Sequence, residues 1–220
     1  MNDYMKITAI MAEPVIYYED GMHFDGLLAY GAFRDYTQKG GAPLPPINLP
    51  WCLDFDLPLE KWECPLPDNV DVDKRLLSDN GKVWGWCGSR VDADWLARGK
   101  MEYRKKPDLG AMGRYTEAKA HHLGAGPLKA FDVAYPTMTA RELRWVARGE
   151  VDQVRHLLSL ISHIGKKSTT GMGAVMEWIV EPCDAVPIER RMPCTGGRMG
   201  AIRPPYHHIS RRVPSDWGAA

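Results

Sequence analysis

The sequence predicts an α+β protein with a long elaboration in its middle. Apolar residues alternate with other residues at 6–12 and at 175–181, which favours a strand near each end of the chain. Residues 25–36 and 140–164 instead carry apolar residues at helical spacing. Strand-like stretches lie between these two segments, so the predicted order is strand, helix, two strands, helix, strand. That order is the ferredoxin-like (RRM-like) plan.

The first strand and helix are predicted from the N-terminal 36 residues. Residues 6–12 alternate around Ile7 and Ala9, and Pro14 limits the strand. Asp25 is of the type that caps a helix, and the helix is expected to run through residue 36. His23 and Asp25 have the composition of a catalytic pair, but a capping aspartate beside a loop histidine is the interpretation that we favour.

A long insertion is predicted at about 38–128. It opens with a proline-rich and glycine-rich loop at 38–50 and continues with strand-like stretches at 51–57 and 82–88. Trp84 and Trp86 share one face of the second stretch. Such a pair can stack on bases, but it more often fills a core, and the core is the interpretation that we favour.

The stretch 98–128 has the composition of a nucleic-acid-binding arm. Its basic residues would neutralise phosphates, while Tyr103 and Tyr115 would stack on unpaired bases, a combination that suits single-stranded RNA. We expect a mobile hairpin that becomes ordered on binding. The candidate RNA-binding residues of this arm are Arg104, Lys105, Lys106, Arg114, Tyr115, His121 and His122.

The second helix is predicted from a capping box. Thr139 and Glu142 have the spacing at which each side chain bonds the other's backbone amide, so a helix is expected from 140 to 148, with a pause at Gly149 and a continuation to Ile164. Gly165 is the expected terminator. A strand is predicted at 131–135, before the proline at 136.

A glycine-rich loop joins this helix to the last strand. Glycines let a backbone approach a phosphate closely, lysines supply charge, and hydroxyl groups supply hydrogen-bond donors. Such a loop grips the RNA backbone and does not read bases, although the same composition also fits an ordinary flexible connection. The candidate residues are Gly165, Lys166, Lys167, Ser168, Thr169, Gly171 and Gly173.

We predict one domain over residues 1–182 and a basic C-terminal extension over 183–220. The extension is rich in proline, glycine and arginine, and we expect Arg203 and Tyr206 to contact RNA or a neighbouring subunit. A solvated tail is the alternative.

The net charge is zero, but the charges are segregated. Residues 51–80 hold eight acidic and three basic side chains, whereas 98–114 and 187–220 each hold six basic and two acidic ones. A neutral protein can therefore present a basic face to phosphate. No apolar run approaches the ~20 residues that span a bilayer, and the N-terminus is unlike a signal peptide, so we expect a cytoplasmic protein with no membrane contact.

Catalytic and metal-binding interpretations have weaker support. The five cysteines have no C-x2-C or C-x4-C spacing, so we predict no metal site and no other cofactor. General acid–base cleavage of RNA would need paired histidine, tyrosine or lysine side chains. His163 beside Lys166, the pair at 121 and 122, and the pair at 207 and 208 are available, but no spacing singles out one of them, and we assign no catalytic residue.

Four stretches together resemble a known family. They are the G-x5-G-x-G loop at 165–173 before the last strand, His23-Phe24-Asp25-Gly26-Leu27-Leu28-Ala29-Tyr30, Ala147-Arg148-Gly149-Glu150, and Arg203-Pro204-Pro205-Tyr206. The loop resembles that of RAMP proteins, the RNA-binding subunits of CRISPR systems. The whole set resembles the Cas-five-type subunit of type IV (Csf) CRISPR effector complexes.

The resemblance implies a RAMP domain whose middle insertion acts as a thumb that folds over the guide RNA. It implies a non-catalytic subunit that binds the 5′ handle of the crRNA, caps a filament of backbone subunits and helps to recruit the large subunit, with target DNA as a further possible partner. Two alternatives remain open. One is a metal-independent endoribonuclease that processes the guide RNA, and the other is a protein-only scaffold.

Overall fold

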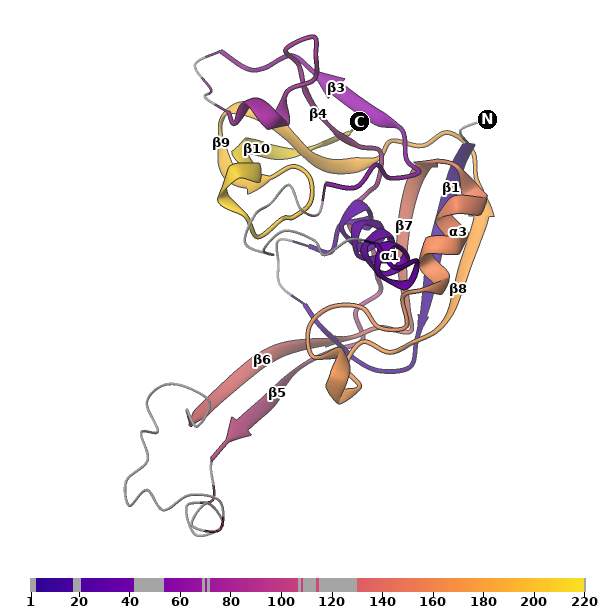
Figure 1. Cartoon of the computed structure of the whole chain (residues 1–220), viewed down its shortest axis with the longest axis vertical. Helices are drawn as coiled ribbons and strands as arrows, with labels where there is room; N and C mark the ends of the chain where they lie inside the picture. Colours follow the sequence, from indigo (N-terminus) through magenta and orange to yellow (C-terminus); the bar gives the residue numbers. More distant parts are fainter. Residues whose placement is uncertain are drawn as a thin grey trace.

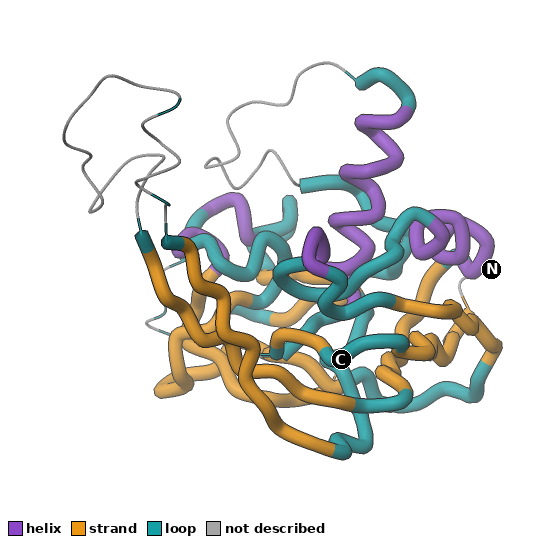
Figure 2. The backbone as a smooth tube through the Cα atoms, turned by 90° about the horizontal axis from the view of Figure 1, so that it is seen from below, coloured by secondary structure: helices purple, strands orange, loops and turns teal. Residues whose placement is uncertain are grey.

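The computed structural model describes residues 3–17, 21–41, 54–68, 70, 72–106, 108, 114 and 130–219. Within these ranges the protein is built mostly of strands in several small antiparallel sheets, together with two α-helices (Figure 1). Figure 2 shows the helices gathered on one side of the strands. The prediction of an α+β protein is confirmed.

A three-stranded antiparallel sheet forms the centre of the main body. Strand β1 (Asp3–Met11) lies between β7 (Glu142–Gly149) and β8 (Val175–Pro182). Ile7 of β1 is paired with Trp145 on one side and with Val180 on the other. The strands predicted near the two ends of the chain are therefore confirmed as direct neighbours.

Strand β7 corrects the prediction of a helix at 140–148. In the structure Leu143, Trp145 and Ala147 are buried and alternate with less buried residues, which is the period of a strand. A helix would also place the first and third of these on one side, but it would turn Trp145 to the opposite side. Burying this large ring with its neighbours favours the strand. Thr139 ends β6 and does not cap a helix.

The second helix is shorter than predicted. Helix α3 covers Val151–Ser159, and Leu160 is its C-cap. Gly165 does adopt the left-handed conformation, with φ of 83°, but it lies in the loop beyond the helix and does not terminate it.

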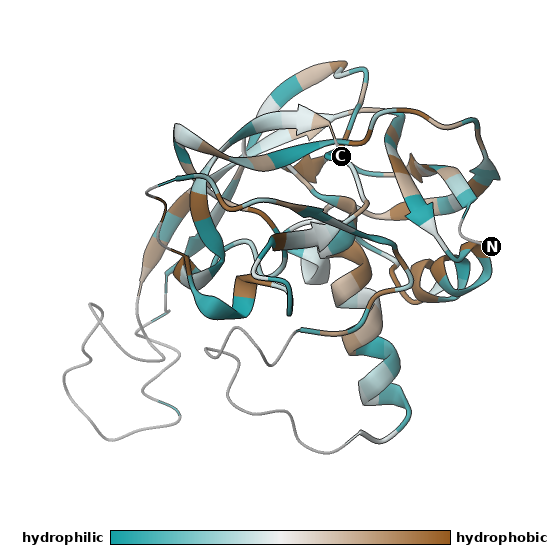
Figure 3. Ribbon diagram, turned by 90° about the horizontal axis from the view of Figure 1, so that it is seen from above, coloured by the Kyte–Doolittle hydropathy of each residue, from teal (hydrophilic) through white to brown (hydrophobic). Residues whose placement is uncertain are grey.

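Helix α1 (Phe24–Gln38) packs beside α3 on one face of the main sheet. Its N-cap is His23, which corrects the predicted cap at Asp25. That aspartate lies in the first turn, fully buried. Figure 3 shows apolar colours in the half of α1 that enters the body and hydrophilic colours toward its end. Neither helix in the described part of the chain has the length and apolar character to cross a bilayer.

The insertion folds partly as a second small sheet. Strands β3 (Lys61–Cys64) and β4 (Val83–Trp86) form an antiparallel pair, and the chain then runs along the outer edge of β7, where Gly88 and Asp92 make bridge contacts. The strand predicted at 51–57 is wrong for 54–57, and residues 51–53 lie outside the described residues. Trp86 is 3% exposed, which confirms the core interpretation for that ring.

The C-terminal extension is a folded hairpin and not a solvated tail. Strands β9 (Glu189–Ala201) and β10 (Arg212–Ala219) pair antiparallel to each other. They bury a second apolar cluster against the β3–β4 pair. The members of this cluster are Trp62, Leu76, Val83, Cys87, Ile188, Ile202 and Val213.

A long two-stranded ribbon extends from the body (Figure 1). It consists of β5 (Ala97–Lys105) and β6 (Phe131–Thr139), with short β2 (Val15–Ile16) paired to the base of β6. Only the first strand of this ribbon lies in the range 98–128 that was predicted to form a hairpin, and the returning strand is the one predicted separately at 131–135. The strand predicted to end before Pro136 continues through that residue to Thr139.

Candidate nucleic-acid interface

Backbone hydrogen bonds join the two ends of the glycine-rich loop at Ile164 and Gly173, and we call this part of the loop its neck. The Ile164 amide donates to the Gly173 carbonyl oxygen at 2.8 Å, and the Gly173 amide donates to the Pro14 carbonyl oxygen at 2.9 Å. Gly173 has φ of 70°, and a Cβ at this position would overlap the Ile164 carbonyl oxygen. Glycine is therefore required at the neck for two reasons, its backbone conformation and its lack of a side chain.

The tip of the loop is exposed and held in a tight turn. Ser168–Thr170 form a single 3₁₀ turn, in which the Thr170 hydroxyl donates to the Lys167 carbonyl oxygen at 2.8 Å. Gly171, with φ of 87°, follows the turn with open space around it. The side chains of Lys166, Ser168 and Thr169 are exposed. The tip therefore has an exposed positive charge and exposed hydroxyl groups, and their contact with RNA stays a prediction.

Lys167 points toward the ribbon. Its Nζ lies 4.0 Å from the centre of the Tyr103 ring and 5.2 Å from that of Tyr135. Figure 1 shows the loop after α3 beside the base of the β5–β6 ribbon. Two segments predicted separately to bind RNA thus lie in contact, and the two neighbouring lysines have different surroundings.

The two faces of the ribbon differ in chemistry. One face carries Tyr103 and Phe131, whose rings stack with centres 5.5 Å apart, and also Tyr135. We define these three residues as the aromatic face of the ribbon. Phe131 and Tyr135 were not among the predicted site residues, because only the register that places Lys105 opposite Phe131 and Met101 opposite Tyr135 shows that they share a face with Tyr103.

The opposite face of the ribbon is charged. Arg104 forms an ion pair with Asp132 at 2.7 Å, and Lys100 forms one with Glu102 at 2.8 Å. Lys105 ends β5 opposite Phe131, and it is exposed, as are Lys106 and Arg114, which follow it in the sequence. Of the other candidate residues of this arm, Tyr115, His121 and His122 lie outside the described residues.

Arg203 and Tyr206 lie away from the loop and ribbon, in the body. Arg203 is 1% exposed, stacks over Trp84 at 3.7 Å, and lies 3.7 Å from an Asp54 oxygen. Burial lowers the pKa of its guanidinium to about 10. The Tyr206 hydroxyl donates to the Asp25 carboxylate at 2.7 Å. The sequence predicts that both side chains contact RNA or a neighbouring subunit. This stays a prediction, and a guanidinium as buried as that of Arg203 would need the surrounding hairpin to move before it could reach a phosphate.

The model of the family CRISPR type IV associated protein Csf3 matches residues 89–214, which is more than half of the chain. The chain belongs to the Csf3 family. The match includes the described ribbon, β7, α3, the glycine-rich loop and β8. It confirms the resemblance to the Cas-five-type subunit of type IV CRISPR systems. No curated protein matches the chain.

The buried carboxylate of the Csf3-family chain has an unusual pKa. Burial raises the pKa of Asp25 to about 6, against the opposing effects of Arg190, 3.8 Å away, and of the Tyr206 hydroxyl. Burial and the nearby Asp25 carboxylate hold the pKa of Tyr206 well above its usual value. The Asp25 carboxylate therefore takes up a proton more readily in the folded protein than in the unfolded chain.

This shift predicts a pH-dependent stability. A carboxyl group whose pKa is raised on folding stabilises the folded state at low pH, and this contribution is lost as the pH rises through about 6. Between pH 7.5 and pH 5 the Asp25 contribution should increase by about 1 kcal/mol. Urea unfolding at both pH values should show this increase in wild type but not in Asp25→Asn. Equal pH dependence in the two proteins would contradict the assignment.

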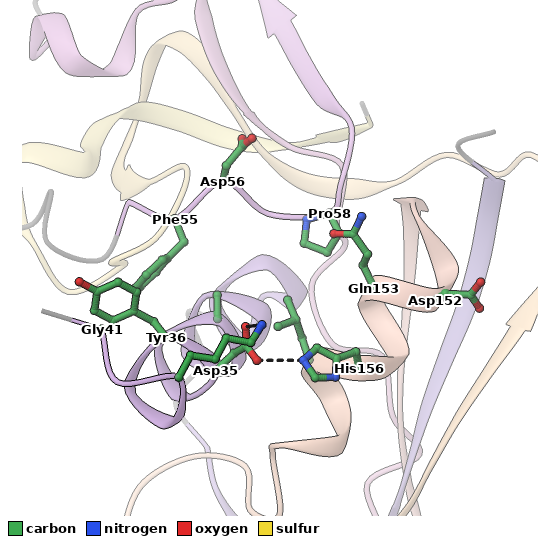
Figure 4. Close-up of a pocket in the computed structure, with 12 residues that line it drawn as sticks. Asp35, Tyr36, Gly41, Phe55, Asp56, Pro58, Asp152, Gln153 and His156 are labelled. Carbon is green, nitrogen blue, oxygen red and sulfur yellow. Dashed lines mark hydrogen bonds and ion pairs between the residues drawn. The ribbon is translucent and has the colours of Figure 1, made fainter.

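A separate cleft lies between the two helices (Figure 4). It encloses about 740 Å³ and is lined by α1, α3 and the segment around Phe55 and Pro58. Asp35 accepts hydrogen bonds from Lys39 at 2.6 Å and from His156 at 2.9 Å, and these bonds lower its pKa. Further carboxylates stand at its rim, at Asp56 and Asp152. This cleft is less suited to phosphate than the loop and ribbon.

Two of the histidines available for acid–base chemistry, His163 and His208, have local partners. The Ser162 hydroxyl lies 3.0 Å from Nδ1 of His163, and the Ser210 hydroxyl lies 2.9 Å from Nδ1 of His208. Within the described ranges neither ring forms an ion pair with a carboxylate, and no three or more His, Cys, Asp or Glu side chains are arranged to hold a metal ion.

Proposed function

We propose that this Csf3-family protein is a non-catalytic crRNA-binding subunit of a type IV CRISPR ribonucleoprotein, and that it binds the 5′ handle of the guide RNA. Membership of the family carries the association with type IV CRISPR systems. The observation that carries RNA binding is the contact of Lys167 with Tyr103 and Tyr135, which joins the glycine-rich loop and the ribbon into one surface.

The chemistry of this surface suits single-stranded RNA. The exposed loop tip supplies the Lys166 ammonium and the hydroxyls of Ser168 and Thr169 to phosphate oxygens. The aromatic face of the ribbon supplies rings on which unpaired bases stack. Lys106 directly follows β5, and both it and Arg114, farther along the sequence, are exposed and add positive charge for the RNA backbone.

We also propose a ferredoxin-like RAMP domain over residues 1–182, with the insertion at about 38–128 as a thumb and 183–220 as an extension. The strand order β7-β1-β8, with both helices on one face, supports this assignment. The bridges of Gly88 to Ala147 and of Asp92 to Arg144 bring a chain segment to the outer edge of β7, which supports a fourth strand at that edge in the proposed fold.

As a handle-binding subunit in the cytoplasm, the protein would cap a filament of backbone RAMP subunits and contact the large subunit, with target DNA passing nearby. The folded β9–β10 hairpin, the acidic cleft and the ribbon offer three chemically different surfaces for such partners. Membership of a type IV CRISPR family supports this proposed arrangement.

Binding of labelled repeat RNA from the associated CRISPR array, in EDTA, tests the proposal. Wild type should bind without cutting, and its affinity should fall steeply with salt, because each neutralised phosphate releases counterions. Lys166→Ala should make the slope of log K against log salt shallower by about 0.7, the value for one lost phosphate contact on a single strand. Fluorescence anisotropy at four salt concentrations gives both quantities.

Lys82→Ala is the matched control, because this lysine is about half exposed and lies on the β3–β4 side of the molecule. It should leave the affinity and the salt slope unchanged. A discrete cut in EDTA would assign the function to a metal-independent endoribonuclease. Absence of binding by wild type would favour a protein-only scaffold.

A further inference from the structure

We propose that Lys167 is a positioning residue, which fixes the direction of the ribbon relative to the glycine-rich loop. The inference rests on the proposed RNA-binding function, and it separates the roles of two adjacent lysines. Lys166 is exposed at the loop tip, whereas Lys167 is half-buried against the ribbon. A side chain dedicated to phosphate would be expected to be as exposed as that of Lys166.

The backbone conformation of Lys167 supports this positioning role. Its φ is 64°, and it is the one residue other than glycine with a positive φ in the part of the chain that the structure describes. Side chains disfavour this conformation, so it persists only where the surroundings impose it. Here the left-handed turn directs the side chain of an otherwise exposed loop toward the ribbon.

The ammonium group of Lys167 lies against both strands of the ribbon. Tyr103 lies on β5 and Tyr135 on β6, and the register puts both on the aromatic face of the ribbon. The Nζ of Lys167 is 4.0 Å from the centre of the first ring and 5.2 Å from that of the second. One cation therefore contacts both strands, within the range at which it is attracted to the ring faces.

The loop also meets the base of the ribbon. A Cβ on Gly165 would lie 3.1 Å from the Ile16 carbonyl oxygen, so the loop passes directly over β2. Strand β2 pairs with β6 through Val15 with Met138 and Ile16 with Thr137. The contact at Gly165 fixes where the ribbon begins, and the contact at Lys167, farther along the ribbon, fixes its direction. The Tyr17 amide also holds the base of the ribbon, by donating to the Pro136 carbonyl oxygen at 3.3 Å, so Lys167 adds a point of attachment farther along the ribbon.

The variants Lys167→Gly and Lys167→Arg separate the effect of the cation from the effect of the strained backbone conformation. Lys167→Gly removes the ammonium and suits the left-handed conformation, so the thermal midpoint should stay equal to wild type or rise. Lys167→Arg keeps a cation that stacks on aromatic rings. A purely structural role would predict the lowest stability for the variant that loses the side chain.

The first readout needs no RNA. The chain has nine tyrosines, so it is labelled with 3-fluorotyrosine, and the ¹⁹F signals of Tyr103 and Tyr135 are assigned with Tyr103→Phe and Tyr135→Phe. Lys167→Gly should shift both signals, and Lys167→Arg should keep them near their wild-type positions. Lys166→Ala should move neither. Unchanged signals in Lys167→Gly would overturn the proposal, whatever the RNA measurements give.

The second readout is affinity for the labelled repeat RNA. Lys167→Gly should weaken binding about threefold to tenfold with the same salt slope as wild type, and Lys167→Arg should restore it. A slope shallower by one phosphate contact, or an unchanged affinity, would show that Lys167 does not act by positioning. If wild type binds no RNA, the proposed function fails, while the fluorine signals still decide whether the contact with the ribbon exists.

Discussion

Replacing Arg190 with alanine should lower the free energy of unfolding by about 3–5 kcal/mol, the range found when one partner of a buried ion pair is removed. Arg190 is 1% exposed. Its Nη2 donates to the Ile202 carbonyl oxygen at 2.7 Å and lies 3.8 Å from the Asp25 carboxylate. Its guanidinium also stacks 4.7 Å from the centre of the Trp62 ring. The variant leaves Asp25 buried without its cation and opens a gap against this ring.

Urea unfolding at pH 7.5 measures this effect, at a pH where the Asp25 carboxylate is ionised. Arg198→Ala is the control, because Arg198 is exposed on the same strand, and it should change stability by less than about 0.5 kcal/mol. Arg190→Met combined with Asp25→Asn removes both charges and should recover part of the loss. A loss below about 1 kcal/mol in Arg190→Ala would show that the pair does not hold the C-terminal hairpin to α1.

The strands and the loop that joins them could be predicted because their patterns are local. Alternation marks β1 and β8, and the three glycines of the loop all adopt positive φ. Strand β7 could not be separated from α3, because a two-residue period at 142–149 leads directly into a helical period at 151–159. Trp145 distinguishes the two, since a continuous helix would turn its ring away from Leu143 and Ala147.

The candidate site was predictable only in part, because its assembly depends on contacts distant in sequence. Lys166 and Lys167 are equivalent in composition, and only the left-handed backbone at the second of them directs it to the ribbon. Arg203 belongs to an arginine-rich tail that resembles a binding segment in sequence. In the structure this part of the chain is buried, because an apolar cluster forms between the β9–β10 hairpin and the β3–β4 pair. No local sequence pattern predicts that cluster.

The variant Gly173→Ala should disrupt the neck of the glycine-rich loop. Alanine at φ of 70° costs about 1–2 kcal/mol for the left-handed conformation alone. At this position the added Cβ also overlaps the carbonyl oxygen of Ile164, which is backbone and has little room to move. The hydrogen bond from the Ile164 amide should break, and the loop should detach from Pro14 and the ribbon.

Gly171→Ala isolates the effect of the overlap. Gly171 has a similar φ of 87°, but an added Cβ would meet nothing within 4 Å. Gly171→Ala is therefore destabilised only by its left-handed backbone conformation. Hydrogen exchange at the Ile164 amide should accelerate strongly in Gly173→Ala and little in Gly171→Ala. Repeat-RNA affinity should fall more than tenfold in the first variant and less than threefold in the second. Equal exchange rates and equal affinities would mean that the neck does not set the shape of the loop. A larger effect in Gly173→Ala than in Gly171→Ala would instead show that the contact between Gly173 and Ile164 sets the backbone geometry with which the loop binds RNA.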